Sequence, residues 1–138
     1  MPFDSDIPTA PLVSLLYRKQ TTYINDELKD TDLSSGLYPV LIKAYKNKNI
    51  SQEELAEKLH VNESTITRNL NKLEKKGFIT KTPQKRKKII SVTDKGEKTA
   101  QKIMDYDEKW DDRIKNNLTE DEFKDFKKLL IKICEELI

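Results

Sequence analysis

Cysteine, histidine and glycine are scarce in this sequence of 138 residues, which holds one Cys, one His and three Gly. One cysteine cannot form an intrachain disulfide, as expected for a protein of the reducing cytoplasm. One His and one Cys cannot build a His/Cys zinc site. Three glycines are too few for a Gly-x-Gly-x-x-Gly fingerprint or a phosphate loop. Since no nucleophile–base pair is apparent either, we expect no metal, no cofactor and no catalytic residues.

Long apolar segments are also missing. No run approaches the ~20 residues that a membrane helix needs. Residues 1–11 carry Asp4 and Asp6 without a basic residue, unlike a signal peptide. We therefore expect no membrane contact. Hydrophobic residues are 36% of the chain, which with glycine stays below the ~45–50% of typical domains. Because this core is thin, we expect apolar surface to be buried against a partner subunit.

Charge is abundant and unevenly distributed. The chain carries 26 basic and 24 acidic residues. Residues 1–38 have a net charge of −3, residues 39–100 of +8, and residues 101–138 of −3. A basic middle between acidic ends is typical of a nucleic-acid-binding lobe on an acidic scaffold. The alternative is a scatter of solvated lysines.

Apolar periodicity and capping residues predict six helices. They cover about 11–29, 34 or 35 to 46, 51–59, 62–76, 93–116 and 119–137. Ser34 or Ser35 can cap the second helix, with Pro39 near the end of its first turn. The third and the last helix each begin with a capping box, at 51–54 and 119–122. His60 and Val61 form a tight turn between the third and fourth helices.

The period changes after Gly77. Residues 78–81 and 89–92 are predicted strands, and residues 82–88 between them form a basic hairpin loop. Two helices joined by a three-residue turn and followed by such a hairpin describe a winged helix-turn-helix. The fold class is therefore mainly α, with a two-stranded β-hairpin wing in a lobe of residues 34–100 flanked by helical segments 1–33 and 101–138.

The helix over 62–76 has two contrasting faces. At about 100° per residue, Ile66, Leu70 and Leu73 fall on one side. The opposite side presents hydroxyls, an amide and positive charge, from Ser64, Thr65, Thr67, Arg68, Asn71 and Lys72. Arg can bridge guanine O6 and N7, Asn can bridge adenine N6 and N7, and hydroxyls reach phosphates or bases. The alternative is a merely solvated face, but the solvated face at 121–132 is rich in Lys and Glu.

Arginine is rare, with four residues against 22 lysines. One of them is on the predicted recognition helix, and another is in the basic loop. Because arginine suits bidentate contacts and narrow minor grooves, we expect Arg68 to read the major groove or its phosphates and Arg86 to enter the minor groove. Lys85, Lys87 and Lys88 neutralise phosphates in this interpretation. The alternative for the loop is a solubilising turn.

At these positions the chain resembles the multiple-antibiotic-resistance regulator (MarR) family. The matching residues are Ile50 to Ala56, Val61 to Arg68, Leu73 to Ile79, and Val92-Thr93-Asp94-Lys95-Gly96, where the family has Leu-Thr-x-x-Gly after its wing. Helices on both flanks match in number and length. One departure is Gln84-Lys85-Arg86, where such wings usually carry Asp-x-Arg; we expect a less rigid wing.

The resemblance implies a homodimeric transcription regulator, usually a repressor, that binds a pseudo-palindromic operator in double-stranded DNA. It implies that segments 1–33 and 101–138 supply dimerisation helices that interdigitate across a two-fold axis. We place seven apolar residues there or in the adjoining core. They are Leu12, Leu15, Leu16, Phe126, Leu130, Ile133 and Leu137.

The resemblance also implies a small aromatic anion as effector, bound between the dimer helices and the DNA-binding lobe. The aromatic candidates for that pocket are Tyr17, Tyr38, Tyr45, Tyr106 and Trp110; core or dimer packing is the alternative for each. Arg18 or Arg113 can meet an anion, although a surface ion pair is the preferred interpretation. Cys134 is interpreted as a buried structural residue rather than a redox sensor, and His60 as a turn or packing residue.

Acidic residues between 105 and 112 interleave with basic ones, which favours a solvated, ion-paired helix over a cation site or a catalytic carboxylate pair. The leading hypothesis is a dimeric DNA-binding regulator. A winged-helix module that binds protein without specific DNA binding is the alternative. An enzyme is the third class, and no motif supports it.

Overall fold

The computed structural model describes residues 3–34 and 36–138. Six helices and three strands are present in these ranges. In chain order they are α1 (Thr9–Leu28), α2 (Tyr38–Lys46), β1 (Ile50–Ser51), α3 (Gln52–Leu59), α4 (Glu63–Lys75), β2 (Ile79–Gln84), β3 (Lys87–Val92), α5 (Asp94–Lys115) and α6 (Glu120–Leu137). No helix among the described residues is both long and apolar enough to cross a membrane.

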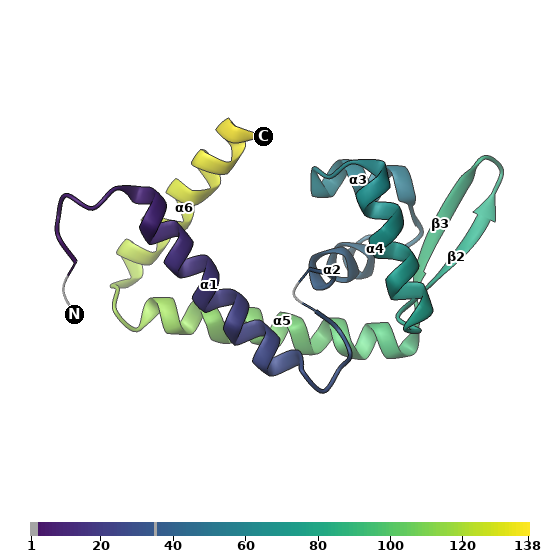
Figure 1. The fold of residues 1–138 in the computed structure, drawn as a ribbon, viewed down its shortest axis with the longest axis horizontal. Helices are drawn as coiled ribbons and strands as arrows, with labels where there is room; N and C mark the ends of the chain where they lie inside the picture. Colours follow the sequence, from purple (N-terminus) through teal and green to yellow (C-terminus); the bar gives the residue numbers. More distant parts are fainter. Residues whose placement is uncertain (1–2, 35) are drawn as a thin grey trace.

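The molecule has two parts joined by the long helix α5 (Figure 1). Helices α2, α3 and α4 with the β-hairpin form one part, and α1 and α6 form the other together with the far end of α5. The start of α1 and the C-terminal end of the chain lie away from the hairpin. The predicted boundary between residues 100 and 101 lies within α5 (Asp94–Lys115), so the division into segments 1–33, 34–100 and 101–138 stays a prediction.

The buried core belongs mainly to the central lobe. Leu41, Leu55, Leu70 and Phe78 are fully buried there. In contrast, α1 buries only Ile24 and Leu28, near its C-terminal end, and α6 buries no residue. Within a single chain the apolar side chains of α6 are therefore covered only in part, and burial against a partner subunit stays a prediction.

The sheet is larger than the sequence indicates. β1, β3 and β2 lie side by side in that order and are antiparallel. The sequence analysis missed the short strand β1, which pairs with β3 and places Ile50 opposite Ile90. The β2–β3 ladder runs from Ile79–Val92 to Gln84–Lys87. The predicted loop over 82–88 is therefore wrong, because most of it extends the ladder and only Lys85 and Arg86 remain in the turn.

The start of the second helix also differs from the prediction. The helix begins at Tyr38 with Leu37 at the cap position, and Pro39 lies in its first turn as predicted. Ser34 does not cap it by its side chain; instead its backbone carbonyl accepts bonds from the N–H groups of Leu37 and Tyr38. The other predicted cap, Ser35, lies outside the described residues. Leu37 is buried, so core packing fixes the entry into the helix.

Candidate nucleic-acid interface

The turn between α3 and α4 sets the angle of the exposed helix. His60 adopts the left-handed conformation with φ of 56°, and its N–H and that of Val61 bond back to carbonyls of the last turn of α3. Such a cap ends a helix sharply. Asn62 then caps α4, because its side-chain oxygen accepts from the Thr65 N–H at 2.8 Å. The predicted turn role of His60 is confirmed.

The cap of α3 departs from the expected capping box. Ser51 Oγ accepts from the Glu54 N–H at 3.2 Å. The Glu54 carboxylate, however, accepts from the Ser51 hydroxyl at 2.9 Å and not from its backbone N–H. Ser51 is also the last residue of β1, which places its backbone in the sheet. The second predicted box, at Thr119 and Glu122, is present with both bonds.

Helix α4 packs with the apolar stripe that its sequence predicts. Ile66, Leu70 and Leu73 are fully buried. The opposite face carries the predicted polar residues, of which Ser64, Arg68, Asn71 and Lys72 are exposed and Thr65 and Thr67 are half-buried. Arg68 reaches back to Thr65 Oγ1 at 3.4 Å. A guanidinium, an amide and an ammonium therefore lie together on one open surface.

Two of the hydroxyls on this helix already have partners within the chain. Ser64 Oγ donates to Asn62 Oδ1 at 2.8 Å. Thr67 Oγ1 donates to the Glu63 carbonyl at 2.8 Å and accepts from Gln52 Nε2 at 2.7 Å. Neither hydroxyl has a proton left for an outside acceptor, although both keep acceptor capacity. Gln52, which joins α3 to α4, is a residue that the sequence analysis missed.

Strand β2 contributes a second missed residue, Lys81. Its ammonium donates to Asn71 Oδ1, and its backbone N–H donates to Glu74 Oε2 at 3.2 Å. Partial burial lowers the pKa of Lys81, while the nearby Glu74 carboxylate opposes that shift. The base of the wing is therefore bonded to α4 through both the side chain and the backbone of Lys81.

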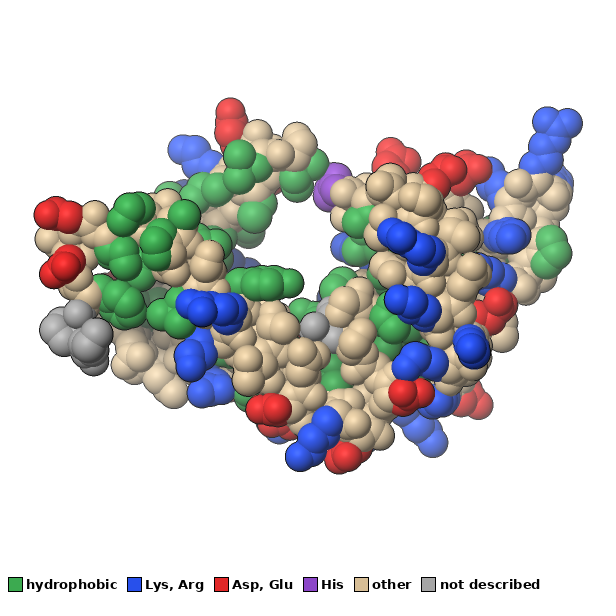
Figure 2. Space-filling view, in the orientation of Figure 1, with side chains coloured by type: hydrophobic (Ala, Val, Ile, Leu, Met, Phe, Trp, Pro, Cys, Tyr) green, Lys and Arg blue, Asp and Glu red, His purple; other side chains and the backbone are tan. Residues whose placement is uncertain are grey.

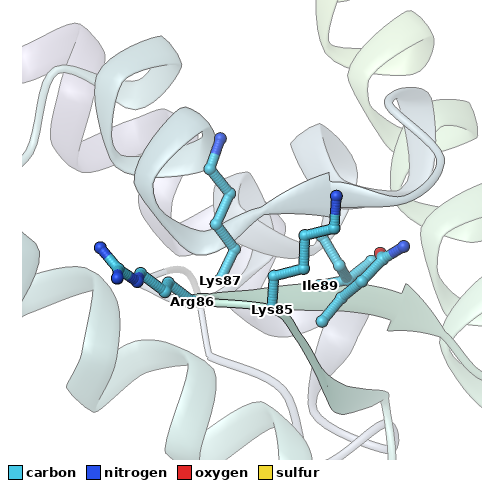
Figure 3. A pocket seen from close by; sticks show the side chains of 5 residues that line it. Lys85, Arg86, Lys87 and Ile89 are labelled. Carbon is cyan, nitrogen blue, oxygen red and sulfur yellow. The ribbon is translucent and has the colours of Figure 1, made fainter.

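The tip of the wing is strongly basic. Lys85, Arg86, Lys87 and Lys88 are all exposed, and Lys85 has φ of 58°. Figure 3 shows Arg86 extending away from Lys85 and Ile89, so the side chains of the tip diverge. Figure 2 shows Lys and Arg side chains gathered over the lobe that carries α4 and the hairpin. Helix α4 and the β2–β3 hairpin thus both carry exposed cations on this lobe.

The five aromatic candidates do not share one cavity in the single chain. Tyr17 and Trp110 line a hollow between α1, α5 and α6. The Tyr38 hydroxyl accepts from Gln20 Nε2 at 2.9 Å; burial raises its pKa and this bond opposes the rise. Tyr45 accepts from Gln101 at 3.3 Å, and Tyr106 packs against the core.

Arg113 was expected in a surface ion pair, and the acidic stretch of α5 was expected to be ion-paired. The structure shows neither among the described residues. Arg113 lies over the ring of Tyr23, 5.1 Å from its centroid, instead of in an ion pair. Among the described residues the one ion pair is Lys76–Asp32, so the run over 105–112 lacks the expected ion pairing, and Tyr106, Trp110 and Asp111 within it are half-buried. Burial and the neighbouring Asp111 raise the pKa of Asp107.

The predicted dimer residues leave an apolar surface open. Leu16, Phe126 and Leu130 line the same hollow as Tyr17. Leu12 and Leu15 are half-buried, and Ile133 and Leu137 are exposed. Apolar side chains cover much of the α1–α6 part in Figure 2. Cys134 is exposed rather than buried as predicted, because α6 packs on little else within one chain.

Comparison with known proteins shows which family has this fold and sequence pattern. Residues 33–88 match the model of the MarR family. The chain is 32% identical to the HTH-type transcriptional regulator BilQ of Clostridioides difficile over 122 residues, which are 86% of this chain and 82% of that protein. The chain belongs to the MarR family.

Two further similarities support membership of the MarR family. The uncharacterized HTH-type transcriptional regulator YybA of Bacillus subtilis is 39% identical over 62% of this chain, a match that spans 59% of YybA. A protein of Listeria monocytogenes, described as a MarR family transcriptional regulator and crystallised with a 26mer DNA, aligns with a TM-score of 0.83. That alignment has 26% identity and covers 97% of this chain and 90% of the other.

These matches confirm the predicted family and the mainly α winged helix-turn-helix fold. They also agree with the expectation of a transcriptional regulator rather than an enzyme. The family departure at Gln84 lies at the end of β2, directly before the two turn residues. Its expected effect on the rigidity of the wing stays a prediction.

Proposed function

We propose that this MarR family regulator binds a specific operator in double-stranded DNA. The observation that carries the proposal is the shared exposure of Arg68, Asn71 and Lys72 on α4 beside the basic wing. A recognition helix of this kind enters the major groove, and cations on the hairpin neutralise phosphates. Arg86 suits the adjacent minor groove because its planar head fits a narrow, electronegative cleft. The Listeria relative crystallised with DNA supports DNA binding by this fold.

The proposed active form is a homodimer. Helix α6 buries none of its residues within one chain, and apolar side chains of α1 and α6 line one open hollow. A second copy covers both surfaces with the same residues. A two-fold dimer presents two α4 helices to half-sites about 10 base pairs apart, which predicts a pseudo-palindromic operator.

We further propose that operator occupancy represses transcription in the cytoplasm and that a small aromatic anion releases the protein. The hollow beside Tyr17 and Trp110 is the candidate site for that anion. Calorimetry with salicylate and a matched DNA-binding assay test the effector. If salicylate gives no binding heat and does not weaken DNA binding, the effector proposal is refuted and the DNA-binding proposal is unaffected.

The wing provides the first test of DNA binding. Replacing Arg86 with Ala removes one charge from each wing and so two from the proposed dimer; we expect weaker binding and a flatter dependence of affinity on salt, by about two units of slope. Arg18→Ala is the matched control, because Arg18 is an exposed residue of α1 outside the proposed interface. If Arg86→Ala and Arg18→Ala bind alike across a salt titration, the wing does not contact DNA.

A further inference from the structure

The amide of Asn71 poses a question of orientation. A primary amide has an acceptor oxygen at one end and a donor NH2 at the other. On an open helix face it can turn over and offer either end to a base. A residue that discriminates between bases needs one orientation, because each base edge has its own order of donors and acceptors. The sequence alone predicts a contact in which Asn71 bridges adenine.

Lys81 distinguishes the two ends of that amide. Its ammonium carries three donors and no acceptor, so it can bind only the oxygen end. The structure places Lys81 Nζ at Asn71 Oδ1. The oxygen is thereby directed at strand β2, and the NH2 group is left for partners outside the protein.

The backbone of Lys81 is held by two neighbours. Its backbone N–H is bonded to Glu74 Oε2 at 3.2 Å, and its backbone pairs in register with the buried Ile90. The side chain is half-buried, whereas Lys85, Lys87 and Lys88 are exposed. Both partners of Lys81 lie on α4, one turn of helix apart. The contact therefore has a fixed donor as well as a fixed acceptor.

We propose that Lys81 is a specificity-determining residue that sets which base edge Asn71 reads by fixing the orientation of its amide. This inference rests on the proposed DNA binding. With its oxygen engaged, Asn71 offers mainly donors. The acceptor-rich edge of guanine, with N7 and O6, then fits better than the adenine edge, which needs both a donor and an acceptor. The adenine contact expected from the sequence is replaced by a preference for guanine.

Relative affinities for an operator and its single-base variants test the role. Asn71→Ala identifies the base pair in each half-site that depends on this amide. Wild-type protein is expected to favour guanine there by on the order of tenfold. Lys81→Met, which keeps the length and removes the donors, is expected to lose that preference while discrimination at other positions remains. Lys81→Arg, which also has only donors, is expected to restore it.

Lys88→Met is the matched control, because it removes one positive charge from an exposed position of the neighbouring strand. It is expected to weaken binding to every sequence equally and to reduce the salt slope by about two, one for each subunit of the proposed dimer. If Lys81→Met behaves in this uniform way, Lys81 acts as a phosphate contact and the inference is overturned. If the wild type shows no sequence preference, the proposed function fails and the inference fails with it.

A second readout needs no DNA. In the free protein, the side-chain amide signals of Asn71 in a nitrogen–proton NMR spectrum, assigned with Asn71→Ala, report its hydrogen bonding. Lys81→Met is expected to move these signals towards those of a solvated amide, and Lys88→Met is expected to leave them in place. Unchanged signals in Lys81→Met would overturn the fixed orientation. Because this measurement uses no DNA, it tests the contact between Lys81 and Asn71 independently of whether the protein binds a specific operator.

Discussion

Gly96 lies where the wing returns to helix α5, and its replacement by Ala is expected to destabilise the protein. A Cβ at this position would lie 2.1 Å from the Phe78 carbonyl oxygen and 2.7 Å from Val92 Cγ1. Carbon–oxygen contacts relax to about 3.3 Å. The start of α5 therefore has to move by about 1 Å from the strand that begins the wing. This close approach explains physically why glycine ends the Val92–Gly96 motif.

Several hydrogen bonds span the same junction. The Thr93 N–H donates to the Phe78 carbonyl at 3.0 Å, Thr93 Oγ1 donates to the Gly77 carbonyl at 2.6 Å, and the Gly96 N–H donates to Thr93 Oγ1 at 3.1 Å. Overpacking costs ~1–3 kcal/mol, and two weakened bonds add ~1 kcal/mol each. Alanine recovers ~1 kcal/mol of helix propensity. The net expected loss in the free energy of unfolding is about 2–4 kcal/mol.

Urea unfolding followed by circular dichroism, at one fixed protein concentration, measures this loss. Gly36→Ala is the control, because a Cβ there meets nothing nearer than Ser34 Oγ at 4.0 Å. We expect its effect to stay within ~0.5 kcal/mol. If Gly96→Ala unfolds at the same urea concentration as wild type, the packing described for the wing–α5 junction is wrong.

Two further predictions address the proposed dimer surface and the loop before α2. Leu130→Lys places a charge in the apolar hollow of α1 and α6, so we expect the dimer dissociation constant to rise by at least about tenfold. Sedimentation velocity checks this against Lys128→Ala, and equal dissociation constants would contradict the interface. The hydrogen bond from Lys76 lowers the pKa of Asp32 below its usual 3.8. Asp32 therefore adds stability above that pH and loses it as pH falls through the lowered pKa. Asp32→Asn should lower the urea midpoint at pH 7, and the difference should vanish in strong acid; a difference that persists there would refute the ion pair.

Helices and the recognition surface were accessible from the sequence because their signals are local. The stripe of Ile66, Leu70 and Leu73 follows the helical period, and the caps at Asn62 and Thr119 directly precede their helices. The outward residues of α4 then follow by geometry. Residues such as Arg68 and Asn71 could therefore be assigned to the outward face from the helical period alone.

The sheet was harder to predict, for two physical reasons. Residues 82–88 lack the apolar alternation of a half-buried strand, because the outer ladder of the wing is exposed on both faces. β1 has only two residues, too few for any period. Similarly, the first turn of α2 is placed by the buried Leu37 rather than by a serine cap.

Side-chain contacts between different helices and strands could not be predicted from the sequence. Lys81 meets Asn71 across ten positions of chain, and Gln52 meets Thr67 across fifteen. No periodicity encodes such pairs, since they depend on how a strand and two helices pack. The exposure of Cys134 was mispredicted for a related reason: it lines an open hollow between α1, α5 and α6, and no residue of α6 is buried within one chain.

Sequence-specific DNA binding by this protein is tested most directly by one binding titration. The purified protein is mixed with DNA from upstream of its own coding sequence and with unrelated DNA of equal length, over a range of salt concentrations. We predict much tighter binding to the upstream fragment, an affinity that falls as salt rises, and a footprint with two half-sites. No binding to either DNA at low salt would contradict the claim and favour a winged helix that binds protein instead.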